Sequence, residues 1–174
     1  MLEFKTPQIE DKAWVDQCFK HLKTMNCDYT FGNMFVWSTE YSTKICRFKD
    51  FFICSWGMGK EKNFGMPVGK GDFKEAVEEV IKYAKANDIM PRFYGVTEAY
   101  VEMLNENFPD AFQFLYDESY GDYIYEVEKM ASLKGKKYHG KRNHITNFKK
   151  NNPNWSFETI NKDNIDDCIN LHAK

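Results

Sequence analysis

A chain of 174 residues with 43% hydrophobic and 17% aromatic residues can bury the core of about one domain, which excludes an intrinsically disordered protein. The formal net charge of -2 argues against a general binder of polyanions. The charge is unevenly distributed, because residues 1–129 carry 15 Lys or Arg and 22 Asp or Glu, whereas residues 130–174 carry 9 and 4. The net charge therefore changes from -7 to +5, which predicts a boundary between two parts of the chain near residue 130.

Features of the termini and the cysteines indicate a cytoplasmic protein. The five cysteines are odd in number and form no C-x-x-C pair, which favours free thiols in a reducing compartment and gives no zinc pattern. The N-terminus lacks the basic and apolar regions of a signal peptide. No apolar run approaches the roughly 20 residues that a membrane span needs. Peripheral contact with a membrane stays open.

The first part of the chain predicts helices and strands in alternation. Apolar residues at helical spacing predict a helix over residues 8–23, with acids early and bases late. The aromatic residues of 28–41 indicate a short helix or an aromatic-lined loop, with their rings filling the core. Residues 43–57 predict a β-hairpin, and a third strand is expected around 63–68.

The clearest helix is predicted over residues 71–88, with Asp72 as its N-cap and Asn87 at its end. A strand over 91–96 and a helix over 97–108, capped by Thr97, follow. Residues 112–130 contain two strand-like runs around an acidic turn at Gly121.

After residue 130 we expect a basic helix, started or broken near Gly135 and Gly140, then a strand over 154–160 and a helix over 161–174. That last helix places Ile165, Cys168, Ile169 and His172 on one side and reaches Lys174 without a cap. The order helix, strand, helix predicts the opening of a second, incomplete α/β unit, which a homodimer would complete.

A glycine-rich turn, residues 69–71, precedes the clearest helix. Its backbone N–H groups and the Lys70 side chain could bind a phosphate at the helix N-terminus. The turn matches neither the Walker A pattern nor G-x-G-x-x-G, and glycine-rich turns before helices are commonplace. Both interpretations stay open.

No catalytic triad or metal site follows from residue spacing. Ser and His occur outside any informative pattern. His139 and His144 are five residues apart, about 500° around a helix, so they do not share a face as metal ligands four residues apart would.

Residues 133–152, here called the basic segment, carry seven Lys or Arg, two His and no acid. If the segment is helical, Tyr138, Ile145 and Phe148 form a narrow apolar stripe, with Lys141 and Arg142 at its edges. Like charges four residues apart repel by a few tenths of a kcal/mol per pair, roughly, so a bound anion would stabilise the helix. The alternative is a solvated basic face.

The order of these residues resembles the phosphatidylglycerol lysyltransferase C-terminal-like family. The resemblance is densest at 120–150: Tyr123 and Tyr125, then Leu133, residues 135–139, residues 141–143, and Asn147 with Phe148. The aromatic segment 29–37 also looks like the start of the family's first half.

The resemblance implies an α+β fold with two GNAT (N-acetyltransferase-like) domains in tandem, similar to Fem-type aminoacyltransferases. Residues 1–129 would be the first domain, with a mixed, mostly antiparallel sheet flanked by helices, and residues 130–174 the opening of the second. Members run to nearly twice this length, so this chain alone is expected to be inactive. Residues 69–71 would lie where acyl-CoA enzymes hold the pyrophosphate, although Met66 replaces the usual Gln or Arg.

The resemblance also implies an acyl- or aminoacyltransferase whose donor is acyl-CoA or an aminoacyl-tRNA. His139, Asn143 and His144 would orient substrate or stabilise charge on the ester oxygen. The donor's anion would be bound by a set of cationic and aromatic residues: Lys136, Lys137, Tyr138, Lys141, Arg142 and Lys70. Two alternatives stay open, namely a non-enzymatic RNA-binding module and an inactive structural domain whose basic segment packs against an acidic partner.

Overall fold

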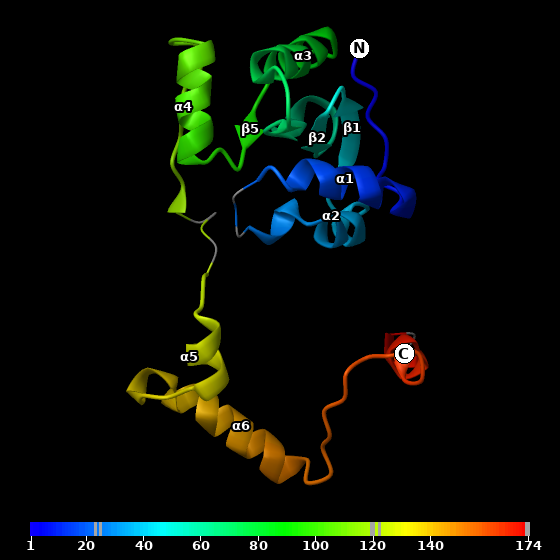
Figure 1. Cartoon of the computed structure of the whole chain (residues 1–174), viewed down its shortest axis with the longest axis vertical. Helices are drawn as coiled ribbons and strands as arrows, with labels where there is room; N and C mark the ends of the chain where they lie inside the picture. Colours follow the sequence, from blue (N-terminus) through cyan, green and yellow to red (C-terminus); the bar gives the residue numbers. More distant parts are fainter. Residues whose placement is uncertain (23, 25, 119–120, 122, 173–174) are drawn as a thin grey trace. The chain divides into compact units, whose positions relative to one another are not determined.

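The computed structural model describes residues 1–22, 24, 26–118, 121 and 123–172 (Figure 1). The chain divides into two compact units, Met1–Gly121 and Asp122–Lys174, here called unit 1 and unit 2. All five cysteines are free, as the sequence predicts. No helix in the described part of the chain is long and apolar enough to cross a membrane.

Unit 1 contains one mixed sheet. Its strands are β1 (Lys44–Phe48), β2 (Phe51–Trp56), β3 (Asn63–Gly65), β4 (Val68–Gly69) and β5 (Phe93–Tyr94). The order is β1-β2-β3-β5, and β4 also pairs with β2. The β3–β5 pair is parallel and the other pairs are antiparallel. The predicted hairpin and the α+β class with a mixed sheet are therefore confirmed.

Helices cover both faces of this sheet (Figure 1). The helical segments of unit 1 are η1 (Ile9–Asp11), α1 (Lys12–Phe19), η2 (Cys27–Tyr29), α2 (Phe31–Trp37), η3 (Gly59–Glu61), α3 (Phe73–Ala86) and α4 (Glu98–Asn107). Because side chains alternate along a strand, Phe52 packs with α1 and α2 while its neighbour Ile53 packs with α3. Successive strand residues thus build two cores.

Local signals account for α3 and α4. The Asp72 side chain accepts a hydrogen bond from the Glu75 N–H at 3.0 Å, as an N-cap does. Phe73, Ala76, Val77, Val80 and Ala84 form the buried stripe of α3. The prediction for α4 is confirmed as a helix with Thr97 at the N-cap position, although the Thr97 side chain makes no capping hydrogen bond.

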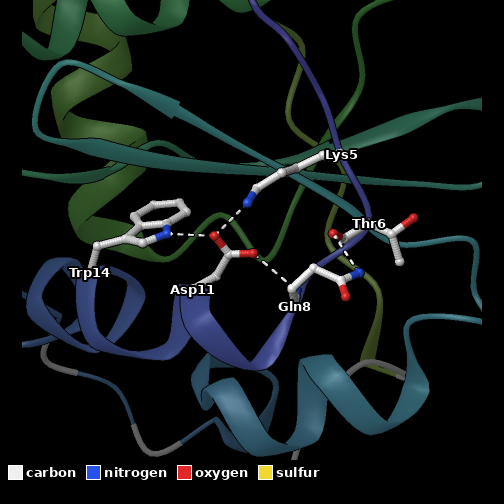
Figure 2. A network of polar contacts seen from close by, with 5 residues as sticks. All are labelled: Lys5, Thr6, Gln8, Asp11 and Trp14. Carbon is white, nitrogen blue, oxygen red and sulfur yellow. Dashed lines mark hydrogen bonds and ion pairs between the residues drawn. The ribbon is translucent and has the colours of Figure 1, made fainter.

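The first predicted helix is shorter than expected. The η1 turn precedes it, where the Asp11 carboxylate accepts hydrogen bonds from Lys5, Gln8 and Trp14 (Figure 2). The α1 helix then ends at Phe19, and the expected end at Lys23 lies outside the described residues.

Of the two interpretations of the aromatic segment, the short helix is correct, as α2. Only Phe31 and Met34 of α2 are buried, so the expectation that all its rings fill the core is wrong for Phe35 and Trp37, which are exposed.

Unit 2 contains α5 (Val127–Ser132), η5 (Lys136–Tyr138), α6 (His139–Asn151) and α7 (Ile165–His172). The expected basic helix is confirmed as α6, and Gly140 lies inside it without breaking it. The strands expected within 112–130 and over 154–160 are wrong for the residues that the structure describes there, and 119–120 and 122 of the turn lie outside them. Alternating Tyr and Ile residues form no strand without a neighbouring strand to pair with, and Tyr116, Tyr123 and Phe157 are exposed.

Candidate anion-binding site

The basic segment presents exposed positive charge. It begins at the C-cap of α5 and continues through η5 and α6. Its six lysines are all exposed: Lys134, Lys136, Lys137, Lys141, Lys149 and Lys150. None of them forms an ion pair with an acid among the residues that the structure describes. The predicted anion-binding residues Lys136, Lys137 and Lys141 therefore lie on one segment without an acidic partner in the described part of the chain.

Arg142 differs from these lysines because its guanidinium is turned back onto the backbone. Its Nη1 donates to the carbonyl oxygen of Leu133 and to that of Gly135, the latter at 2.8 Å. Leu133, with φ 47°, ends α5 in the left-handed conformation, and Gly135, with φ 96°, precedes η5. Carbonyls at a helix end lack partners within the helix. Arg142 thus satisfies them and holds the turn between α5 and α6.

We expect Arg142→Ala to loosen this turn. A hydrogen bond from a charged donor contributes about 1.5 kcal/mol, so the amides of Leu133 and Tyr138 should exchange with solvent about tenfold faster. Hydrogen–deuterium exchange measures this, with the exposed neighbour Lys141→Ala as control. Unchanged exchange in the Arg142 variant would contradict the assignment of Arg142 as a positioning residue.

The three predicted catalytic residues divide between two faces of α6. His139 Nε2 and Asn143 Nδ2 lie 3.2 Å apart, one helical turn from each other. An amide nitrogen can only donate, so a hydrogen bond between the two requires that the His139 Nε2 accept it. His144 is rotated about 140° away from His139 and lines a different surface. The structure brings His139 and Asn143 together and leaves His144 apart.

That second surface is an aromatic hollow, formed by His144, Ile145, Phe148, Lys149 and Trp155. The rings of Phe148 and Trp155 meet edge to face with centroids 6.3 Å apart. Lys149 Nζ lies 5.0 Å from the centroid of the Trp155 ring. The sequence did not single out Trp155, although an aromatic residue just after a basic helix could have indicated it.

Two further residues of the predicted anion-binding set, Tyr138 and Lys70, differ from the exposed lysines of the basic segment. Tyr138 is buried at the start of α6, so its ring is not available for stacking on a ligand. Lys70 is exposed and belongs to unit 1, in the turn between β4 and α3.

Unit 1 contains a cavity of about 310 Å³ next to that turn. Gly69 and Gly71 line it together with residues from the N-terminal ends of α3 and α4, including Phe73 and Tyr100. Burial raises the pKa of Tyr100 to about 12, and its hydroxyl donates to the Pro67 carbonyl at 3.4 Å. The hydroxyl therefore stays protonated at neutral pH.

Within the ranges described, no three His, Cys, Asp or Glu side chains gather as they would around a metal ion.

Comparison with known proteins relates this chain to one family. The model of the family described as phosphatidylglycerol lysyltransferase, C-terminal, matches residues 19–174. A crystal structure of a conserved protein of unknown function from Bacteroides thetaiotaomicron VPI-5482 is similar, with a TM-score of 0.81 and 32% sequence identity. The similarity covers 99% of this chain and 58% of that one, so this chain spans less than two thirds of that relative. Comparison with curated proteins gave no match.

Proposed function

Since the chain belongs to the phosphatidylglycerol lysyltransferase C-terminal family, we propose that it acts in aminoacyl or acyl transfer and binds an anionic donor through residues 134–150. The proposed donor is an aminoacyl-tRNA. We also propose that residues 1–129 form one GNAT-like domain, which includes all of unit 1, and that residues 130–174 are the opening of a second. A mixed sheet with helices on both faces and the longer relative support this architecture.

The observation that carries the proposal is the contrast between lysines inside and outside the basic segment. Several lysines of unit 1 pair with acids, as Lys5 does with Asp11 and Lys82 with Glu79. The six lysines of the basic segment have no acidic partner in the described residues, and the segment contains no acid. Exposed like charges repel one another, and a phosphate backbone offsets that repulsion.

We propose that His139 and Asn143 act on the ester of such a donor, which their contact with each other supports. In the proposed reaction an acceptor hydroxyl or amine attacks the ester carbonyl carbon and forms the new bond. The bond from that carbon to the ribose oxygen breaks, and the acceptor's proton passes to the ribose oxygen. One N–H of the Asn143 amide donates to His139, and the second has no partner among the described residues. That N–H can stabilise the negative charge that develops on the carbonyl oxygen.

We expect the protein to bind charged tRNA with a strong dependence on salt, and a triple variant to lose part of that dependence. The variant replaces three exposed lysines of the basic segment by Ala: Lys136, Lys137 and Lys141. Each neutralised phosphate contributes roughly 0.7–0.9 to the slope of log affinity against log salt, so the slope should fall by about two. Filter binding to charged and uncharged tRNA across a salt series measures both slopes.

The matched control replaces three exposed lysines of α3 by Ala: Lys74, Lys82 and Lys85. It should bind as the unmodified protein does. An equal fall in the slope for the control would mean that net charge alone drives binding. Absence of binding in all three proteins would rule out tRNA as the ligand. Binding without preference for charged tRNA would favour the RNA-binding module over the transferase. A loss of stability alone in Lys141→Ala would favour the structural role.

A further inference from the structure

The aromatic hollow of α6 has the composition of a stacking site. Phe148 is 52% exposed and Trp155 45% exposed, although both are large apolar side chains. Their edge-to-face contact fixes each ring against the other, and Ile145 adds apolar surface beside them. A hollow with fixed and exposed rings gains free energy when a flat apolar group covers it.

The charges around the hollow identify the kind of group. Lys141, His144 and Phe148 follow one another at three and four residues, so all three lie on the same side of α6. Lys149 lies over the Trp155 ring itself. Lys141 precedes Phe148 by seven residues, about 10 Å along the helix axis, so it lies outside the hollow toward the start of α6, whereas Lys149 is one of the residues that line the hollow. With no acid in the basic segment, the surroundings attract an anion.

We propose that this hollow stacks an unpaired nucleobase whose flanking phosphates contact Lys141 and Lys149. A nucleobase joins a flat π-face to phosphates on both sides, which is the chemistry that this surface complements. An apolar polypeptide would match the rings but gain nothing from the cations. The inference rests on the proposed function, because the unpaired base belongs to the anionic donor bound by the basic segment. His139 and Asn143, on the other face of α6, take no part in it.

The test compares two single-stranded DNA hexamers that carry the same phosphates: one with adenine at every position and one abasic throughout. We expect the unmodified protein to bind the adenine hexamer about tenfold more tightly, within the range that aromatic stacking of one base provides. Trp155→Leu and Phe148→Leu should each remove most of this ratio between the two affinities. Neither substitution should change the salt dependence of binding to the abasic hexamer. Trp155→Tyr should retain part of the ratio.

The matched control is Phe157→Leu, which replaces an aromatic residue of unit 2 that is 86% exposed and lies outside the hollow. This variant should keep the full ratio between the affinities for the adenine and the abasic hexamer. Equal binding of the two hexamers by the unmodified protein would overturn the nucleobase inference. It would not contradict the proposal that the basic segment binds an anionic donor. A ratio that Phe157→Leu also removes would overturn the nucleobase inference as well. If neither hexamer binds at any salt concentration, both the inference and the anion-binding role of the basic segment fail.

Discussion

Replacing Gly69 with Ala is expected to lower the free energy of unfolding of unit 1 by about 3 kcal/mol. Gly69 lies on β4, opposite Phe51 of β2. A Cβ at this position would lie 2.1 Å from the Asp50 carbonyl oxygen and 2.8 Å from the Phe51 Cα. Both atoms belong to the backbone, so no side-chain rotation relieves the clash. The β2–β4 pairing must open instead.

Urea unfolding followed by tryptophan fluorescence measures this loss, and Gly32→Ala is its control. Gly32 lies inside α2, and a Cβ there would meet no atom within 4 Å. Alanine is preferred to glycine in a helix by about 0.5–1 kcal/mol, so the control should be slightly stabilised. A Gly69→Ala protein as stable as the unmodified one would contradict the close approach of β4 to β2.

The close approach of β4 to β2 also accounts for a glycine in the glycine-rich turn, residues 69–71. The sequence left open whether residues 69–71 bind a phosphate or form an ordinary turn. A Cβ at position 69 would clash with the Asp50 carbonyl oxygen, so this position needs glycine. Gly71 has φ 140°, and a Cβ added there would lie 3.1 Å from the Phe51 ring. Both glycines are thus required by packing, without any ligand.

The elements that the sequence predicted correctly are those defined by neighbouring residues. The α3 helix depends on the cap from Asp72 to Glu75 and on a stripe with helical period, all within one segment. The α6 helix needs only its own residues as well. The strands expected over 112–130 and 154–160 depended on partners elsewhere in the chain, and alternation alone does not supply a partner. Apart from a hairpin such as β1–β2, whose strands are neighbours in the sequence, sheet pairing is a non-local property that residue order does not reveal.

The same distinction separates the site residues. The pairing of His139 with Asn143 follows from a spacing of four on a helix. Arg142 was expected to bind phosphate, yet its guanidinium donates to the Leu133 and Gly135 carbonyls, in the turn where Leu133 adopts a left-handed conformation. A positive φ at a leucine has no sequence signal. Trp155 reaches the hollow only because the chain turns back after α6.

Asp11 organises the N-terminal turn of unit 1, and its replacement is the second large effect that we expect. Its buried carboxylate accepts hydrogen bonds from Lys5 Nζ at 2.6 Å, the Gln8 N–H at 2.9 Å and Trp14 Nε1 at 2.9 Å (Figure 2). Burial by itself raises the pKa of Asp11, but the hydrogen bonds from Lys5, Trp14 and Gln8 outweigh burial and leave the pKa below its ordinary value. The folded state therefore favours the ionised carboxylate.

That lowered pKa makes the stability of unit 1 depend on pH in a definite direction. A carboxyl group with a lower pKa in the folded state stabilises the fold most when it is ionised in both states. The contribution is fully present above the pKa of the unfolded chain, near 3.8, and is lost as the pH falls through the lower pKa of the folded state. The difference in unfolding free energy between the unmodified protein and Asp11→Ala should shrink on acidification over that range.

At neutral pH, Asp11→Ala is expected to lower the free energy of unfolding by about 2 kcal/mol, because the Gln8 and Trp14 donors lose their acceptor in a partly buried site. Lys5, which is largely exposed, regains water and adds little. Asp16→Ala is the matched control: Asp16 pairs with Lys12 on the exposed side of α1, and its loss should change stability by about 0.5 kcal/mol or less. Urea titrations at neutral and acidic pH measure these changes. Equal losses of unfolding free energy in the two variants at neutral pH would mean that the Asp11 network does not stabilise the turn.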